Sequence, residues 1–323
     1  MKLEEITRPV SEELEEFNHF FRSAMRSKVA FVDLIARYII RQKGKRIRPA
    51  LVLLTAKACG MVNDSTYRGA SLVEILHTAT LIHDDVVDDA DTRRGLASIN
   101  AVWKNKIAVL MGDYMLAKGL LLSLDHNDFQ FLKITSDAVR RMSEAEILQI
   151  AKSRDLDIDE ATYLKIISDK TASLLSTCCQ IGGASVTHDE EILRRLKEFG
   201  ENIGMVFQIR DDLLDYTGRK SITGKPTGLD MKEKKLTLPL IHSFSNAPNG
   251  RSRAILRIIK NGSSKKELQS IVEFAHEFGG IEYTTRKAEL YSNLALEAIE
   301  PLPESPSKDA LRRFVGFVLE RSK

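Results

Sequence analysis

Two short clusters of aspartate are the residues of this sequence best suited to carry chemistry. They share the spacing Asp-Asp-x-x-Asp and comprise Asp84, Asp85 and Asp88 in the first cluster and Asp211, Asp212 and Asp215 in the second. Each cluster follows an apolar stretch with helical spacing, residues 72–82 and residues 203–209. A helix turns by about 100° per residue, so Asp84 and Asp88 project about 40° apart from one face. Unpaired carboxylates at this spacing repel one another and weaken the helix.

A solvated helix face or a helix cap explains either aspartate cluster taken alone. Two matching clusters, which begin 211 − 84 = 127 residues apart, favour a shared metal site instead. Aspartates without Cys ligands and without two His at i, i+4 suit a hard cation such as Mg²⁺, which prefers oxygen and retains water. Mg²⁺ held by few carboxylates usually completes its shell with phosphate oxygens. The sequence should therefore also contain cations that bind phosphate.

Three basic stretches provide such cations. Five of the eight residues 41–48 are basic, and Arg93 and Arg94 directly follow the first aspartate cluster. Four lysines lie just beyond the second cluster, namely Lys225, Lys232, Lys234 and Lys235. Arginine offers paired donors to phosphate oxygens, and lysine offers a compact charge. A solvated helix end or charge balance with the aspartates would also explain these residues, but neither requires the Gly and Pro turns around them.

The rest of the chain is predicted to be helical and to position these charged residues. Apolar residues recur at helical spacing almost throughout, as in residues 31–39, 255–259 and 268–274. We find no convincing alternation typical of β-strands, and turn-forming residues divide the chain into about a dozen helices. The simplest assembly is one all-α bundle with a single core. Since no repeat or linker divides the chain, we expect one domain over residues 1–323.

Composition restricts the classes of protein that fit. The chain has 323 residues, 43% hydrophobic and 29% charged, and a net charge of +3 that does not indicate nucleic-acid binding. Three cysteines, two of them adjacent, make no disulfide framework. We find no signal peptide and no convincing membrane span, so we expect a cytoplasmic protein with at most peripheral membrane contact. P-loop and Gly-x-Ser-x-Gly motifs are absent from the sequence.

The charged motifs occur in the order typical of the trans-isoprenyl diphosphate synthases, the polyprenyl synthetase family, which the chain resembles over about residues 20–320. The matching segments are, in chain order, GKRIRP at 44–49, HTATLIHDDVVDDADTRRG at 77–95, Lys170-Thr171, FQIRDDLLD at 207–215 and GKPTGLDMKEKKLTLP at 224–239. The ordered set is highly specific, and we see no departure in the diphosphate and metal motifs. The match looks most like the long-chain members, such as octaprenyl and heptaprenyl diphosphate synthases.

The resemblance implies an all-α fold around a deep central cavity and a homodimer. It implies that isopentenyl diphosphate condenses head-to-tail onto an allylic diphosphate such as farnesyl or geranylgeranyl diphosphate. About three Mg²⁺ ions per active site would be held by the two aspartate clusters, on either side of the allylic diphosphate. The residues implied to bind isopentenyl diphosphate are Lys45, Arg48, His77 and Arg94. Those implied to bind the allylic diphosphate are Arg93, Lys170, Thr171, Gln208, Lys225 and Lys235, with Lys170 and Lys225 also catalytic.

Elementary chemistry agrees with this implied reaction. Breaking the allylic C–O bond leaves a resonance-stabilised cation and a heavily charged diphosphate, whose growing charge Mg²⁺, Lys and Arg stabilise. The isopentenyl double bond then attacks the cation, and a proton is lost, for which the departed diphosphate is the expected base. Water would quench the cation and must be excluded. An apolar barrel beneath a charged mouth meets these needs.

Product length is expected to depend on the helix that leads into Asp84. In the family, bulky aromatics four or five residues before the first Asp give short products, but Thr80 and Ala79 occupy these positions and are small. With Leu76 one turn deeper, we expect an open tunnel and products longer than the C20 geranylgeranyl diphosphate. We expect the tunnel floor elsewhere, and the candidates are Met111, Met115 and Gly119.

Four other functions would require sequence features that differ from those present. A short-chain synthase is disfavoured by the small residues before Asp84. A class I terpene cyclase normally carries Asn, Ser or Thr with Glu in its second metal motif, and needs no isopentenyl site such as Lys45 and Arg48. A metal-dependent phosphohydrolase built on His83 and Asp84 would need further His ligands. A non-enzymatic helical scaffold would not bind diphosphate in the presence of Mg²⁺.

Overall fold

Helices make up most of the described chain, as the periodicity predicts. The computed structural model describes residues 2–42, 44, 46–93, 95–217, 235–262 and 264–321. The elements, in chain order, are α1 (Leu3–Thr7), η1 (Arg8–Val10), α2 (Ser11–Ala24), α3 (Ala30–Arg41), α4 (Ile47–Cys59), α5 (Asp64–Val87), β1 (Thr92–Arg93), β2 (Leu96–Ala97), α6 (Ile99–Leu124), α7 (Phe129–Asp155), α8 (Glu160–Ile167), η2 (Ser168–Ala172), α9 (Ser173–Ala184), α10 (Glu190–Thr217), α13 (Leu238–Asn246), α14 (Asn249–Asn261), α15 (Lys265–Glu277), α16 (Gly280–Ile299) and α17 (Pro306–Leu319).

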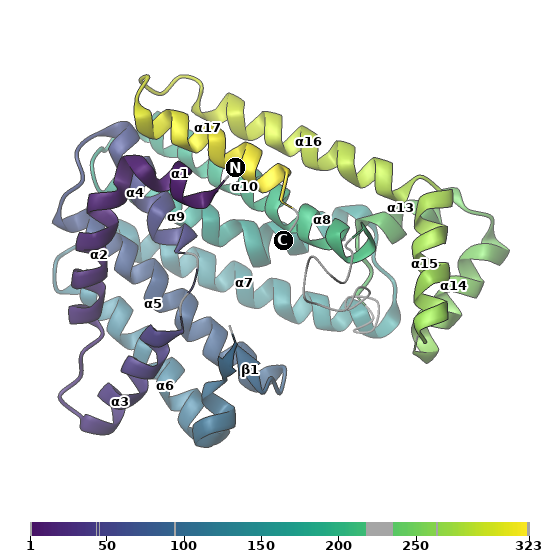
Figure 1. Ribbon diagram of the computed structural model, residues 1–323, viewed down its shortest axis with the longest axis horizontal. Helices are drawn as coiled ribbons and strands as arrows, with labels where there is room; N and C mark the ends of the chain where they lie inside the picture. The colour runs from purple at the N-terminus through teal and green to yellow at the C-terminus, as the bar shows by residue number, and fades with distance from the viewer. Residues whose placement is uncertain are drawn as a thin grey trace.

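The long helices α5, α7, α9, α10 and α16 form the body of the molecule (Figure 1). Helix α9 contacts α4, α5, α7 and α10, so it lies at the centre of this arrangement. The N-terminal helices α1 to α4 cover one end, and the paired helices α14 and α15 stand at the other (Figure 1). This topology is all-α, as expected.

Three buried apolar clusters hold the helices together. The first joins α4, α5, α9, α10 and α17, the second joins α8, α10 and α13 to α16, and the third joins α3, α5 and α6. Each fully buried Leu, Ile or Phe side chain in them contributes about 1.5–3 kcal/mol relative to an exposed one. Helices α5 and α10, which carry the two aspartate clusters, each take part in two apolar clusters. The carboxylates are therefore presented on well-anchored helices.

Helix α5 begins and ends with defined backbone features. Its N-cap residue Asn63 accepts hydrogen bonds from the backbone N–H groups of Ser65 and Thr66, at 2.9 and 3.2 Å. The helix ends just before Asp88, and the next residue, Asp89, has the left-handed φ of 50°. A two-residue antiparallel hairpin of β1 and β2 follows, turning at Gly95 with φ 79°. The periodicity does not predict this hairpin because its strands are too short to show alternation.

A π turn separates α8 from α9. It spans Ser168–Ala172, and its wider ring inserts one extra residue into an otherwise continuous helix. Two glycines let α10 approach this region closely, because a Cβ at Gly204 would lie 2.4 Å from the Cα of Ala172, and one at Gly200 would lie 2.5 Å from the Cα of Ser176. The π turn is thus in direct contact with the helix that carries the second aspartate cluster.

The cysteines are not paired, and two of them are fully enclosed. Cys178 and Cys179 on α9 have no exposed surface, and burial raises the pKa of the Cys178 thiol to about 12. Burial also raises the pKa of Cys59 to about 11. Cys178 and Cys179 therefore act as small apolar core residues.

Among the described helices, α6 alone is long and apolar enough to cross a membrane by length and composition. One such helix is weak support for a span, because core helices of soluble proteins pass the same test. One side of α6 packs against α5 in the third apolar cluster.

Candidate active site

The three aspartates of the first cluster have different surroundings. Asp85 is 3% exposed. Its carboxylate accepts a 2.8 Å hydrogen bond from Nε of Arg93 and forms an ion pair with the same guanidinium. Asn100 on α6 donates to the backbone carbonyl of Asp85 at 3.1 Å, which anchors the end of α5. Asp84 and Asp88 are exposed. The last turn of α5 therefore fixes one carboxylate and leaves two open.

Asp84 faces charged groups from other helices. Although its side chain is open to solvent, surrounding protein partly desolvates it and raises the pKa of the carboxyl group. The carboxylates of Glu146 on α7 and of Asp88 raise that pKa further, while Lys170 and Arg93 lower it. A cation bound beside Asp84 would relieve this crowding of negative charge.

Lys170 extends from the π turn to α7. Its Nζ forms an ion pair with Glu146 and donates a 2.7 Å hydrogen bond to Oε1 of Gln149. Because Lys170 also acts on Asp84 electrostatically, it connects the π turn with the first aspartate cluster.

The second aspartate cluster is tied to the π turn by a chain of hydrogen bonds. Thr171 donates to Oε1 of Gln208 at 2.8 Å, and Nε2 of Gln208 donates to Oδ1 of Asp212 at 2.7 Å. The hydroxyl of Tyr163 donates to Oδ2 of Asp212 at 2.7 Å, so both oxygens of this carboxylate, which is 4% exposed, are held. Asp211 is exposed and lies 3.7 Å from a guanidinium nitrogen of Arg321.

Three hollows adjoin these residues. The first is lined by residues of α7, α8, η2 and α10 and by the chain before α13, including Lys170, Thr171, Gln208, Asp212 and Lys235. The second lies between α2, α3, α5 and the hairpin, and its lining includes Arg46, Glu74, Asp85 and Arg93. The third is apolar and lies between α5, α7 and α9, with Leu76, His77, Thr80, Met142 and Leu174 among its lining residues. The two polar hollows offer partners for charged head groups, and the third, which is small, offers apolar walls of the kind that a hydrocarbon contacts.

Most of the expected diphosphate-binding residues that the structure describes line these hollows. Lys170, Thr171, Gln208 and Lys235 line the first, and Arg93 lines the second. His77 is buried and lines the apolar pocket instead of the second hollow. Arg48 lies half-buried in the first turn of α4, two residues after Arg46, which lines the second hollow. Lys45, Arg94 and Lys225 lie outside the described residues.

The residues expected to control product length occupy two places. Thr80 and Leu76 line the apolar pocket. Ala79 belongs to the third buried cluster, between α5 and α6, together with Met111 and Met115. It is absent from the described lining of the apolar pocket, because a shift of one residue turns the side chain by about 100° around α5. The described lining of this pocket comes from α5, α7 and α9 and includes none of the floor candidates on α6.

Sequence reasoning missed several residues that the structure brings into the site. Glu146 and Gln149 reach Lys170, and Tyr163 reaches Asp212. Arg46 was part of a matching motif but received no role, and it lines the second hollow, where burial lowers the pKa of its guanidinium and Glu74 raises it. Among the described residues, no three His, Cys, Asp or Glu side chains meet closely enough to hold a metal ion by themselves. The carboxylate oxygens present are nevertheless the donors that Mg²⁺ prefers, with phosphate oxygens or water completing its shell.

Comparison with known proteins finds one family throughout. Residues 29–275 match the family model described as polyprenyl synthetase. The chain is 34% identical over 325 residues to the octaprenyl diphosphate synthase of Escherichia coli (strain K12), covering 100% of both proteins. It is 35% identical over 319 residues to the all-trans-nonaprenyl-diphosphate synthase (geranyl-diphosphate specific) of Rhodobacter capsulatus, covering 98% of both.

Solved structures give the same result. The chain is similar, with a TM-score of 0.90 and 31% identity, to a polyprenyl synthase from Caulobacter crescentus CB15 complexed with calcium and isoprenyl diphosphate. That likeness covers 100% of this chain and 98% of the other.

Proposed function

The chain belongs to the polyprenyl synthetase family, and we infer from this membership that it is a prenyltransferase that condenses isopentenyl diphosphate onto an allylic diphosphate. The product is a long-chain trans-polyprenyl diphosphate, and pyrophosphate is released. One observation carries the proposal at the level of residues. Lys170 lines a pocket with Asp212 and also interacts electrostatically with Asp84, so both aspartate clusters border the same site.

We propose that the site binds divalent ions, about three Mg²⁺ in all, between the aspartate clusters and the diphosphate. The metal-binding residues would be Asp84, Asp85, Asp88, Asp211, Asp212 and Asp215. The crowding of carboxylates around Asp84 supports this proposal, as does the calcium in the Caulobacter crescentus structure. Bound Mg²⁺ stabilises negative charge on a departing diphosphate as a Lewis acid.

The protein's own cations and amides would hold the two substrates. We propose that Lys170, Thr171 and Gln208 bind the allylic diphosphate, because they line one pocket and are joined to Asp212 by hydrogen bonds. Arg93, Lys225 and Lys235 would complete that set. Isopentenyl diphosphate would be bound by Lys45, Arg48 and Arg94 around the hollow that Arg46 and Arg93 line. His77 would contribute from the neighbouring apolar pocket, on the same helix α5.

The apolar pocket would hold the hydrocarbon chain and exclude water. Its lining includes Leu76, Thr80, Met142 and Leu174, which offer few groups able to bring water to an allylic cation. The departed diphosphate remains the proposed proton acceptor, because it lies beside the new bond and carries negative charge. Each added isoprene unit requires about five more carbons of apolar wall, so a long product needs this pocket to extend along α7 and α9.

We propose that the protein is a homodimer that forms through α6. This helix exposes Val102, Val109, Leu110, Leu120, Leu121 and Leu124. A large exposed apolar face marks an interaction surface, and closed two-fold dimers are the commonest oligomers. A second copy of this chain is therefore the partner that the exposed side of α6 fits.

Two further expectations remain proposals. We propose that residues 1–323 form one domain, supported by Tyr291, which packs against both the first and the second apolar cluster. We also propose a cytoplasmic location with at most peripheral membrane contact, which cell fractionation would test.

The proposed activity can be tested by incubating the protein with farnesyl diphosphate, labelled isopentenyl diphosphate and Mg²⁺, and then sizing the products. Labelled polyprenyl diphosphate longer than C20 is the expected result, and removal of Mg²⁺ with a chelator should abolish it. Products of C20 or shorter would support the alternative of a short-chain synthase. A cyclic hydrocarbon formed without incorporation of label would contradict the proposal in favour of a terpene cyclase.

A further inference from the structure

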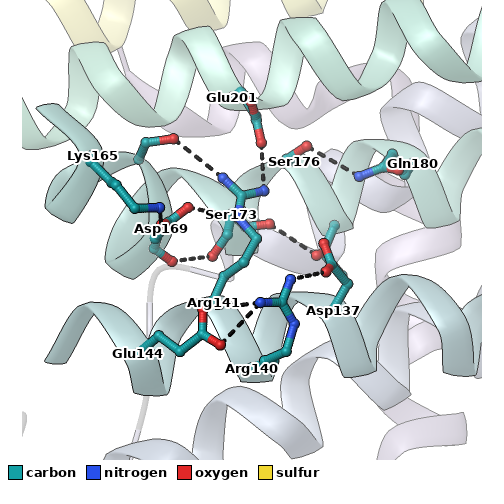
Figure 2. Close-up of polar contacts among 12 residues, drawn as sticks. Asp137, Arg140, Arg141, Glu144, Lys165, Asp169, Ser173, Ser176, Gln180 and Glu201 are labelled. Atoms are coloured by element: carbon teal, nitrogen blue, oxygen red, sulfur yellow. Dashed lines mark hydrogen bonds and ion pairs between the residues drawn. The ribbon is translucent and has the colours of Figure 1, made fainter. Parts of the chain in front are cut away.

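Arg141 on α7 lies at the centre of a group of ion pairs and hydrogen bonds that we call the Arg141 cluster. Figure 2 shows its charged members, Arg141, Lys165, Asp169 and Glu201, and Ser168 completes it. Nε of Arg141 donates to Oδ1 of Asp169 at 2.7 Å, and Nη1 donates to Oε1 of Glu201 at 2.6 Å. Nη2 donates to the hydroxyl of Ser168 at 3.2 Å. One guanidinium thus binds the π turn and α10 from a third helix.

The neighbouring arginine has a different environment. Arg140 pairs only with Asp137 and Glu144 among the described residues, on its own helix, and its side chain is 59% exposed (Figure 2). The side chain of Arg141 is 18% exposed, and that of Asp169 is 11% exposed. An ion pair removed from solvent is screened far less than a surface pair. The two adjacent arginines therefore offer a matched comparison between a buried connection and a surface ion pair.

Asp169 is the anchored residue of the π turn. Its second carboxylate oxygen accepts from Nζ of Lys165 at 2.7 Å, and its backbone carbonyl accepts from the hydroxyl of Ser173 at 2.5 Å. The next two residues, Lys170 and Thr171, line the first hollow. Because the extra residue of a π turn rotates the side chains that follow it, the placement of Asp169 sets the direction of Lys170 and Thr171.

Glu201 connects the same arginine to the helix of the second aspartate cluster. It lies 208 − 201 = 7 residues, or about two turns, before Gln208 on α10, and so occupies nearly the same face. Gln208 in turn joins Thr171 to Asp212. Arg141 and Gln208 therefore connect the π turn to α10 at two levels, one outside the pocket and one within it.

We propose that Arg141 is a positioning residue for the allylic diphosphate, which holds Asp169 and Glu201 so that Lys170 and Thr171 face the pocket. This inference rests on the proposed function. Arg141 itself does not line the described pockets, so it acts through the π turn. Loss of the guanidinium leaves the carboxylate of Asp169 with Lys165 as its remaining side-chain partner among the described residues, and allows the π turn to shift.

The test compares Arg141→Met with Arg140→Met in the full-length protein. For Arg141→Met, we expect the KM for the allylic diphosphate to rise about tenfold or more, because small displacements of a binding group cost this much. The KM for isopentenyl diphosphate should change less than about threefold in both variants. A residue that served only to stabilise the fold would lower the active fraction and the apparent kcat while leaving both KM values unchanged, and that result would overturn the proposal.

Two milder variants keep the proposal testable where Arg141→Met does not fold. Arg141→Lys retains the charge without the planar fork, and Glu201→Gln retains the size of the side chain without its charge. Both should raise the allylic KM by smaller factors than Arg141→Met, and an allylic KM equal to that of the wild type in both would refute the positioning role.

Two measurements that do not depend on turnover test the positioning role of Arg141 separately from the proposed prenyltransferase activity. Calorimetry with inorganic pyrophosphate and Mg²⁺ should show weaker binding to Arg141→Met than to Arg140→Met. Hydrogen exchange without any ligand should be faster at the amides of residues 168–172 in Arg141→Met alone. If the wild type does not condense its substrates, the proposed function fails. If these two measurements do not distinguish the arginine variants, the positioning role fails.

Discussion

At the residue scale, each aspartate cluster contains one buried carboxylate that the protein holds, and the aspartate just before it in the sequence is exposed. Arg93 holds Asp85, and Tyr163 and Gln208 hold Asp212. Asp84 and Asp88 project from the end of α5 into solvent. A held carboxylate is oriented before any ligand arrives, whereas the open ones are available to a cation.

Replacement of Asp84 or Asp88 by Ala should lower turnover by about a thousandfold, because each removes an oxygen donor expected to hold the ions that stabilise the leaving group. The thermal unfolding midpoint should stay within a few degrees of the wild type, since both side chains are exposed. Steady-state kinetics and calorimetric melting check both parts. The control is Asp309→Ala on α17, which removes another exposed acidic side chain. If Asp84→Ala turns over substrate as fast as Asp309→Ala, the metal role of Asp84 is ruled out.

Asp169 should make the stability of the protein depend on pH in the acid range. Burial acts to raise the pKa of its carboxyl group, but the hydrogen bonds from Lys165 and Arg141 prevail, so the pKa is lowered. In the unfolded chain the pKa is about 3.9. The stabilisation is therefore complete above about pH 5, begins to fall near the unfolded pKa, and is lost as the pH falls through the lower native value.

Urea unfolding of the wild type and of Asp169→Asn measures this effect. The difference in the free energy of unfolding should be constant between about pH 7 and pH 5 and should narrow toward pH 3. A difference that stays the same over the whole range would show that the charge of Asp169 does not contribute.

At the element scale, the orientation of α5 about its own axis determines which part of the molecule each of its side chains contacts. Thr80 faces the apolar pocket, whereas Ala79 faces α6 in a closely packed cluster. Adjacent residues of the same helix therefore belong to different parts of the molecule.

This orientation gives opposite expectations for two aromatic substitutions. Thr80→Phe should shorten the product, because the ring enters the pocket where the chain would grow. Ala79→Phe should instead destabilise the fold by about 1–3 kcal/mol through overpacking against Met111 and Met115. Product sizing and chemical denaturation of both variants check this, and a shorter product from Ala79→Phe alone would show that the wall lies on the α6 side.

The helical elements could be predicted from the sequence because apolar residues recur at helical spacing in segments such as α3, α14 and α15. The choice of which carboxylate is held could not, since Asp84 and Asp85 are the same residue type and differ only in the direction they face. Tyr163 lies 49 residues from Asp212, and only the folded chain brings them together. The π turn at Ser168–Ala172 gives no periodic signal because it is a single turn. The binding and catalytic roles assigned to the site residues all stay predictions, and Lys45, Arg94 and Lys225 lie outside the described residues as well.

At the scale of the whole molecule, the exposed apolar side of α6 should govern association. Leu110 on α6 is 56% exposed, and Leu290 on α16 is 49% exposed. Leu290 therefore serves as a matched control for Leu110, with similar exposure on a different helix. Leu110→Glu should convert a dimer into monomers, because a charge buried between two copies is costly. Leu290→Glu should remain dimeric in sedimentation experiments. A wild-type monomer, or a Leu110→Glu dimer of unchanged affinity, would contradict the proposed interface.

The enclosed thiols of Cys178 and Cys179 have a consequence for how the whole molecule can be observed. Only a thiolate reacts rapidly with an alkylating reagent, and neither sulfur is ionised or accessible in the native state. Alkylation at α9 therefore requires the surrounding helices to separate. Its rate under native conditions would report how often the helices around α9 open transiently. Ligands that stabilise the closed molecule would slow this alkylation.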